Sequence, residues 1–246
     1  MTPLNVWRIR KLRSVVVGLL AVAIAALTGV AAAPAAQAAT SCISPHCYSV
    51  GLLYRSDFTG IYGEWHSNNM YLSNADYPSG SHINSEMWLS TNTTGSTWVE
   101  TGIRNGIDPG DPCGCTAYEV FWADESSGGN FARHYIANVS PDGTDHSYII
   151  QRGSSANRWD VYYDGYLQGT STVTGSWTGY RQAVGGEVQV NDLSTAWCDW
   201  FEQTSEFRDG AGNWYLSVGG ASVPTQEVDP GFTGYWVNSD WVWWKH

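Results

Sequence analysis

Residues 98–103 of this chain read WVETGI, and residues 184–190 read VGGEVQV. In a β-strand, successive side chains point to opposite faces of the sheet. The aliphatic side chains of each segment therefore share one face. A glutamate lies on the other face, Glu100 in the first segment and Glu187 in the second. Both segments predict half-buried strands that hold a carboxylate on rigid backbone, with glycines beside it.

The rest of the chain follows a similar pattern. Short runs rich in Trp, Tyr, Val and Ile alternate with clusters of Gly, Asn, Asp and Ser, which predicts an all-β protein. Strands at this spacing favour a two-sheet antiparallel β-sandwich or jelly roll. The dipeptide Asp164-Gly165 predicts a type I′ hairpin. The predicted strands are residues 48–54, 61–71, 82–90, 97–103, 118–123, 133–139, 145–152, 158–163, 166–171, 185–190 and 214–218.

Three segments are less regular. Residues 194–207 could form a helix, although their tryptophans fit a loop equally well. Residues 219–232 are predicted to form a loop. The Trp-rich residues 236–244 could bind sugar rings, but such a tail more often forms a last strand or covers a sheet edge.

The N-terminal residues have the pattern of an export signal. Four basic residues between positions 8 and 13 precede an apolar run at residues 15–30, and Ala36-Gln37-Ala38 follows as a small-residue cleavage site. We therefore expect residues 1–38 to be a signal peptide, residues 39–246 to form a single β-sandwich domain, and the protein to be secreted and extracellular. A single membrane anchor is the alternative. No later stretch is apolar enough to cross a membrane, so we expect no membrane association after cleavage.

The charge balance excludes some partners. The chain has 12 basic and 23 acidic residues, and four of the basic ones precede the apolar run. Without the signal peptide, 8 basic residues face 23 acidic ones, a net charge near −15. Such a surface repels nucleic acid, so we expect no nucleic-acid partner. We also expect the protein to be a monomer.

All five cysteines follow the predicted signal peptide, in a compartment where disulfides persist. Cys42 and Cys47 are close enough to pair locally, and Cys198 with either Cys113 or Cys115 is the further pairing we expect. A zinc site at the Cys-Gly-Cys step is disfavoured because no second ligand pair has the usual spacing. The sequence predicts neither a metal nor a cofactor.

A third glutamate belongs to the same set. In residues 82–89, alternation puts Glu86 and Trp88 on one face. A hairpin through residues 92–95 would place this strand beside the strand that carries Glu100. Glu86 and Glu100 would then lie close together on a Trp-lined face. The alternative is that these glutamates are solvated residues on an outer sheet face.

Other common chemistries have little support. The sequence has no Gly-x-Ser-x-Gly elbow and no phosphate-binding loop. His66, His82, His134 and His146 lack the spacing of metal ligands, and hydrogen-bonded structural histidines are the more common role.

These segments resemble the neprosin-like glutamic peptidases, whose two catalytic glutamates lie near a Glu-Ala-Gly-Trp step and in a Gly-Gly-Glu-Val step. Here residues 100–103 (ETGI) match the first step loosely, and residues 185–188 (GGEV) match the second closely. The intervening elements follow in a similar order, and the resemblance covers roughly residues 82–209. Three further segments match family positions: residues 85–88 (SEMW), 121–124 (FWAD) and 157–159 (NRW).

This chain departs from the neprosin-like family in three features of that family. The family usually carries a long pro-segment, its cysteine-rich stretch follows the aromatic strand, and it has glutamine where this chain has Glu86. A relative that keeps the sandwich without peptidase activity is therefore an alternative.

The resemblance implies an endopeptidase that hydrolyses peptide or protein substrates with Glu100 and Glu187 as catalytic residues. One glutamate, ionised, would take a proton from the attacking water. The other, protonated, would stabilise the oxyanion and donate to the leaving nitrogen. The assignment of base and acid stays open at this point, and an acidic activity optimum is expected. We expect the substrate contacts to include Glu86, Trp88, Trp98, Trp122 and Gln189.

Two other functions fit the same residues. A glycoside hydrolase can place two glutamates in a Trp-lined groove of a jelly roll. A secreted carbohydrate-binding module without catalysis would use the aromatic faces alone, and replacing Glu100 and Glu187 would leave its binding intact.

Overall fold

The computed structural model describes residues 46–73, 80–108, 116–172, 176–217, 225–237 and 241–246. The chain divides into two compact units, Met1–Gln37 and Ala38–His246, and all described residues belong to the second. The predicted signal peptide and the predicted pairings of Cys42, Cys113 and Cys115 therefore lie outside the described residues, so these predictions remain untested. Within the described ranges, no helix has the length and hydropathy needed to cross a membrane.

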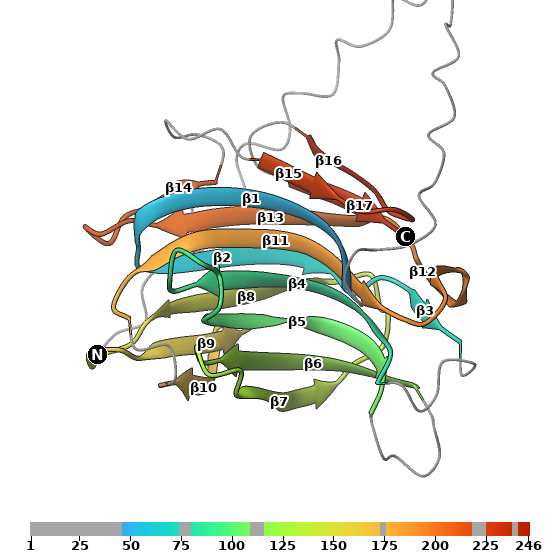
Figure 1. Cartoon of the computed structure of the whole chain (residues 1–246), viewed down its shortest axis with the longest axis horizontal. Coiled ribbons are helices and arrows are strands. Elements are labelled where there is room, and N and C mark those ends of the chain that lie inside the picture. Colours follow the sequence, from blue (N-terminus) through green and yellow to red (C-terminus); the bar gives the residue numbers. More distant parts are fainter. Residues whose placement is uncertain (1–45, 74–79, 109–115, 173–175, 218–224, 238–240) are drawn as a thin grey trace, which may run out of the picture. The chain divides into compact units, whose positions relative to one another are not determined.

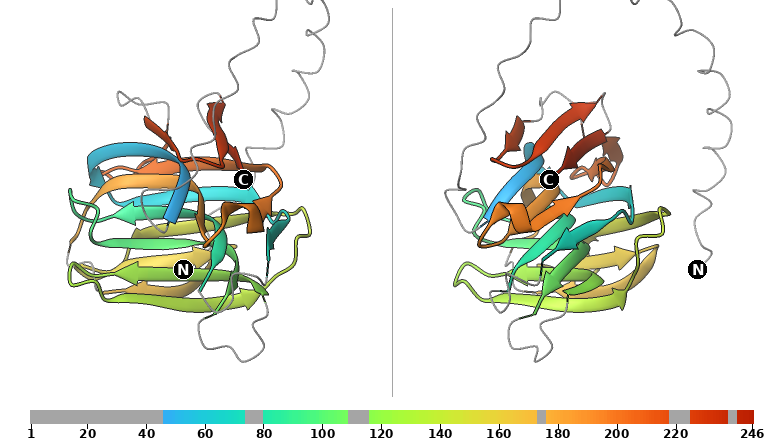
Figure 2. Two further views of the ribbon diagram at one scale, coloured as in Figure 1. Left: turned by 45° about the vertical axis from the view of Figure 1, so that its right-hand side comes forward. Right: turned by 90° about the vertical axis from the view of Figure 1, so that its right-hand side faces the viewer.

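The described residues form two main antiparallel sheets, which lie one behind the other (Figures 1 and 2). The first sheet contains, in spatial order, β15 (Thr225–Val228), β1 (His46–Phe58), β11 (Gly179–Gln189), β4 (His82–Ser90), β5 (Trp98–Ile107), β6 (Thr116–Glu125) and β7 (Phe131–Asn138). The second contains β10 (Tyr166–Ser171), β9 (Trp159–Tyr163), β8 (Asp145–Arg152), β2 (Gly60–His66), β13 (Phe201–Arg208), β17 (Trp241–Lys245) and β16 (Thr233–Val237), with β14 (Trp214–Leu216) paired to β13. A small third sheet joins β3 (Met70–Leu72) to β12 (Ala196–Cys198). The predicted all-β, two-sheet sandwich is confirmed.

The core lies between the two main sheets. Alternate residues of β4, β5 and β11 point into it, among them Met87, Ile103 and Val188, all fully buried. On the second sheet the rings of Trp65 and Tyr148 stack with their centroids 4.0 Å apart. Because aliphatic side chains fill this interior, the residues between them along each strand must face outward. That alternation puts Glu100 and Glu187 on the outer face of the first sheet.

Several local predictions are confirmed. The strands β4, β8 and β10 have the predicted bounds. The hairpin between β9 and β10 turns at Asp164 and Gly165, whose φ angles of 48° and 79° are both positive, as a type I′ turn requires.

Other predictions need correction. Residues 61–71 form two strands in different sheets, β2 and β3, with residues 67–69 between them. Residues 194–207 are not helical: the short 3₁₀ turn η3 (Leu193–Thr195) precedes β12 and β13, and alternate residues of β13 are buried. The predicted loop at 219–232 contains β15, which pairs with β1. The Trp-rich tail forms the paired strands β16 and β17 of the second sheet.

Two glycines let the strands of the first sheet approach closely around Glu86. In register, Glu86 of β4 lies opposite Gly185 of β11 on one side and Gly102 of β5 on the other. A Cβ atom on Gly102 would lie 2.3 Å from the Ser85 carbonyl oxygen, and one on Gly185 would lie 2.0 Å from the Ser49 carbonyl oxygen. Backbone atoms cannot yield by that much, so only glycine fits at either position.

We predict that Gly102→Ala lowers the free energy of unfolding by about 1–3 kcal/mol, because overpacking against backbone forces the strands apart. Thermal unfolding followed by circular dichroism measures this as a lower Tm. Gly128→Ala is the matched control, because the nearest atom to its Cβ would be a side-chain nitrogen of Asn130 at 3.4 Å. Equal losses of Tm in the two variants would contradict the packing argument.

Candidate active site

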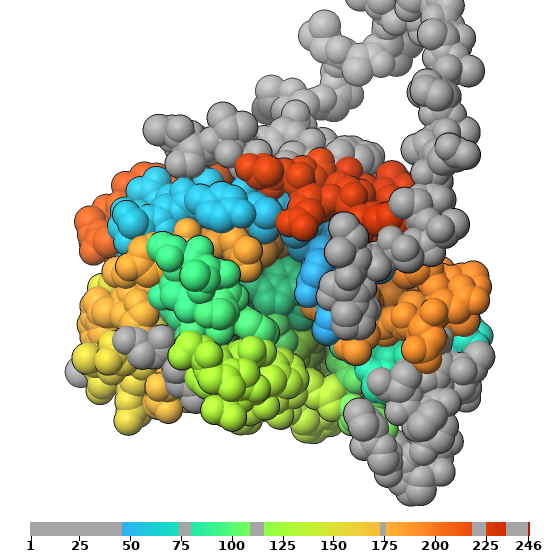
Figure 3. Space-filling model, viewed as in Figure 1, coloured from blue at the N-terminus to red at the C-terminus, as the bar shows by residue number. Residues whose placement is uncertain are grey.

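The outer face of the first sheet is hollowed into a cleft of about 940 Å³. Its lining comes from β1, β11, β4, β5, β6 and β7, with Glu100 and Glu187 among the lining residues. Figure 3 shows the hollow between β1 and the strands β6 and β7. The two glutamates singled out from the sequence therefore share one concave surface.

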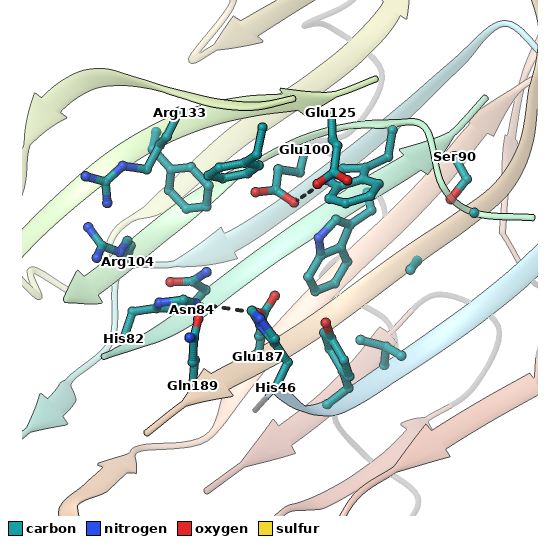
Figure 4. A pocket seen from close by; sticks show the side chains of 18 of the residues that line it. His46, His82, Asn84, Ser90, Glu100, Arg104, Glu125, Arg133, Glu187 and Gln189 are labelled. Carbon is teal, nitrogen blue, oxygen red and sulfur yellow. Dashed lines mark hydrogen bonds and ion pairs between the residues drawn. The ribbon is translucent and has the colours of Figure 1, made fainter. Parts of the chain in front are cut away.

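The register of β4 with its neighbours sets the relative positions of the two glutamates. Glu187 of β11 lies opposite Asn84 of β4, and Glu100 of β5 lies opposite Trp88 of β4. The two backbones that carry them are two strand spacings apart across the sheet, about 10 Å, and four residues apart along β4, about 13 Å. Both side chains are buried and face the cleft from either side of β4 (Figure 4). The two carboxyl groups thus lie on a diagonal across the floor, with β4 between them.

Glu86 lies on β4 between Asn84 and Trp88, beneath the cleft floor. Its exposed fraction is 0%, and it is not among the residues that line the cleft. Asn84 Nδ2 donates a hydrogen bond to one of its oxygens at 3.2 Å. Burial, followed by the charges of Glu100 and Glu187, raises the pKa of Glu86 well above its usual range. The surroundings of Glu86 therefore favour its neutral, protonated form.

Glu100 is also held in its neutral form. Burial, followed by the charge of Glu187, raises the pKa of Glu100 to about 8. Trp98 Nε1 donates a hydrogen bond to Glu100 Oε2 at 2.9 Å, which favours the carboxylate but does not outweigh the burial. Below about pH 8 this carboxyl group carries a proton that it can donate into the cleft.

Glu187 has the opposite ionisation. Burial alone would raise its pKa, but hydrogen bonds and charges from His46 and His82 lower the pKa of Glu187 well below its usual range. His46 Nδ1 contacts Glu187 Oε1 directly, and His82 Nε2 lies 3.4 Å from the same oxygen. The bond to Glu187 also raises the pKa of His46. The cleft floor thus combines one ionised carboxylate with one protonated carboxyl group, as a general base and a general acid require.

The walls of the cleft add apolar and charged surface. Aromatic residues from five strands line it: Tyr48, Trp88, Trp98, Phe121 and Phe131. Arg104 and Arg133 lie together at one end (Figure 4). Arg104 Nη1 donates to Asp108 at 2.9 Å and to Glu119 at 3.1 Å, so its charge is already paired. These surfaces suit a ligand with apolar side chains and hydrogen-bonding groups.

The structure brings together some of the residues predicted to contact substrate. Trp88, Trp98 and Gln189 line the cleft beside the two glutamates, whereas Glu86 lies beneath its floor. Trp122 is placed elsewhere, because strand alternation turns its neighbour Phe121 toward the cleft. Trp122 itself faces the core, and its ring stacks on His134 with centroids 3.8 Å apart.

The sequence reasoning missed His46, His82 and Arg104 as cleft residues. Alternation could have found two of them, because His82 lies four residues before Glu86 and Arg104 four residues after Glu100, on the same face. His46 was missed because the first strand was predicted to begin at residue 48, whereas β1 begins at His46.

Comparisons with known proteins bear on the fold. No family model matches the chain, and a search of curated proteins found no relative. Among solved structures, scytalido-glutamic peptidase with a transition-state-analogue inhibitor is similar at a TM-score of 0.53 and 10% identity, covering 80% of this chain and 97% of that one. The chain therefore shares the β-sandwich fold of this structure.

Two further solved structures are similar to the chain, to different degrees. SCP-B, a member of the eqolisin family of peptidases in complex with the tripeptide Ala-Ile-His, is similar at a TM-score of 0.53 and 11% identity, covering 80% of this chain and 96% of that one. A Bacillus licheniformis β-glucanase reaches a TM-score of 0.39 and 14% identity, covering 79% of this chain and 70% of that one. At these identities the comparisons describe the fold and carry no reaction.

We predict that the protonation of Glu100 makes the free energy of unfolding depend on pH. Between about pH 4.5 and 8 the folded state holds a proton on Glu100 that the unfolded chain releases. The free energy of unfolding therefore falls as pH rises through this window. The Glu100→Gln variant has no such dependence on pH at this position. The difference in free energy of unfolding between this variant and the wild type should therefore shift in favour of the variant by on the order of 1–3 kcal/mol from pH 4 to pH 7.5.

Urea unfolding at several pH values measures this difference. Glu202→Gln is the matched control, because Glu202 is a half-buried glutamate on β13 of the second sheet. If the wild-type and Glu100→Gln profiles run parallel from pH 4 to pH 7.5, Glu100 does not hold a proton in the folded protein.

Proposed function

We propose that the protein is a secreted, monomeric glutamic endopeptidase of the neprosin-like kind, with Glu187 as general base and Glu100 as general acid. The observation that carries the proposal is the pairing of an ionised and a protonated carboxyl group on the floor of one cleft. The fold shared with a glutamic peptidase supports it, as do the sequence steps around both glutamates. The assignment of the two roles, open from sequence alone, follows from the histidines beside Glu187.

The proposed reaction uses both carboxyl groups in one step. A peptide bond lies across β4 with its carbonyl oxygen toward the proton of Glu100. Glu187 takes a proton from a water molecule as the water oxygen attacks the carbonyl carbon. Glu100 stabilises the oxyanion by hydrogen bonding and then donates its proton to the leaving nitrogen as the C–N bond breaks; the proton that Glu187 took from water returns the pair to its starting state.

The cleft also supports a polypeptide substrate. Two structures of similar fold hold a transition-state-analogue inhibitor and a tripeptide. By extension, we propose that an extended peptide binds here, with its apolar side chains on the aromatic walls and its backbone over the floor. The paired state of Arg104 argues against phosphate recognition and thus against a nucleic-acid ligand.

We predict that Glu100→Gln and Glu187→Gln each lower the kcat for hydrolysis of a denatured protein by about 10²–10⁴-fold, because each removes one proton-transfer group. Glu202→Gln, distant from the cleft, should keep wild-type activity. The assay runs at pH 4 and pH 7, with a parallel set of polysaccharides. Proteolysis retained in both cleft variants would remove these residues from the mechanism. Cleavage of a polysaccharide without proteolysis would favour the glycoside hydrolase alternative.

We further predict the alkaline limit of the activity. The working state needs Glu100 protonated, and its pKa is about 8. Activity should therefore persist from acidic pH to neutrality, a broader range than the acidic optimum expected from the sequence, and fall about tenfold per pH unit above about pH 8. A pH profile of kcat/KM measures this limb. Activity that continues to rise up to pH 10 would show that Glu100 does not act as the acid.

A further inference from the structure

Three side chains at one end of the cleft floor converge on a single point. His46 of β1, His82 of β4 and Glu187 of β11 each offer a ligand atom, and these atoms lie within 4.8 Å of one another. Their side chains are 34%, 15% and 9% exposed, respectively. The point is therefore sheltered by three strands and open on the cleft side (Figure 4).

The donor set has a definite metal preference. Two imidazoles and one carboxylate form a common protein ligand set for zinc when a fourth position stays open. With Zn–N distances near 2.0–2.1 Å, neighbouring ligand atoms of a tetrahedral site lie about 3.3 Å apart. His82 Nε2 and Glu187 Oε1 are 3.4 Å apart, close to that edge. Calcium and magnesium prefer sites made of oxygen ligands, so this set disfavours both.

The backbone provides an independent second observation. His82 Nδ1 donates a hydrogen bond to the Gly80 carbonyl oxygen at 3.1 Å, which fixes a proton on that nitrogen. The other ring nitrogen, Nε2, is thereby turned toward Glu187 Oε1, 3.4 Å away. A ligand histidine whose other nitrogen donates to a carbonyl is the usual outer-shell arrangement of protein metal sites.

We propose that His46, His82 and Glu187 bind one divalent transition-metal ion, with Zn²⁺ as the best fit and its open coordination position facing the cleft. His46 Nδ1 contacts the same oxygen directly in this structure, so its ring must withdraw to admit the ion. His46 is the most exposed of the three ligands and borders the open cleft, which leaves space for that movement.

The consequence for activity rests on the proposed function. A metal ion on Glu187 engages the oxygen that would otherwise take a proton from water. Bound Zn²⁺ should therefore inhibit proteolysis, and a chelator should restore it. Binding itself does not depend on the reaction.

The first test measures binding to the tag-free protein by calorimetry with Zn²⁺ and by the absorption spectrum of Co²⁺. We expect one ion per chain and a tetrahedral Co²⁺ spectrum, with Mg²⁺ and Ca²⁺ unable to compete. His46→Ala and His82→Ala should each weaken binding at least about tenfold. His66→Ala is the matched control, because His66 pairs with Asp145 at 2.8 Å on the second sheet.

Circular dichroism and Tm confirm that each variant is folded, and His46→Gln and His82→Gln replace any alanine variant that is not. Absence of Zn²⁺ binding, or binding unchanged in the variants of both histidines, would overturn the site. Proteolysis assays on the same samples separate the two proposals. Zn²⁺ binding in a protein without proteolytic activity overturns only the proposed function. Proteolysis that needs Glu100 and Glu187 in a protein that binds no Zn²⁺ overturns only the metal site.

Discussion

The register of β4 between β11 and β5 is the constraint on which the rest of the site depends. It places Glu86 between two glycines and sets Glu187 and Glu100 on either side of the same strand. The second sheet supports this register from behind, because Gln203 Nε2 donates to Ser85 Oγ at 2.9 Å. A slip of β4 by one residue would turn Glu86 into the apolar core and Met87 out of it, which is strongly destabilising.

Burial then decides how the carboxyl groups ionise. Three glutamates gathered in a low-dielectric patch cannot all carry a charge, since each charge raises the pKa of its neighbours. His46 and His82 select Glu187 as the ionised member by donating hydrogen bonds to it. For Glu86 and Glu100 burial is the strongest influence on the pKa, and it favours the neutral form of both. The asymmetry needed for acid–base chemistry thus comes from β1 and the start of β4.

Much of the fold could be predicted from the sequence, because period-two alternation is a local signal. Alternation placed Glu100 and Glu187 on outward faces and gave β4 its bounds. It failed for Trp122, because an aromatic ring suits a core and a cleft equally well, and only the register of β6 decides between them. It also missed His46, whose role depends on the pairing of β1 with β11, residues more than a hundred positions apart in the chain. Long-range pairing of this kind cannot be predicted from the sequence of one strand.

His46 and His82 allow two ways of neutralising Glu187: protonated histidines, or a metal ion that the neutral histidines bind. A carboxylate buried on an apolar sheet face must be neutralised by a proton, a protonated histidine or a metal ion. The structure supplies two imidazoles at hydrogen-bonding range, which can act either as cations or as neutral metal ligands. In the first state Glu187 keeps an oxygen available to a water molecule in the cleft. In the second state the metal ion takes that place. The same three side chains can therefore hold the floor of the cleft in a state that can accept a proton or in one that cannot.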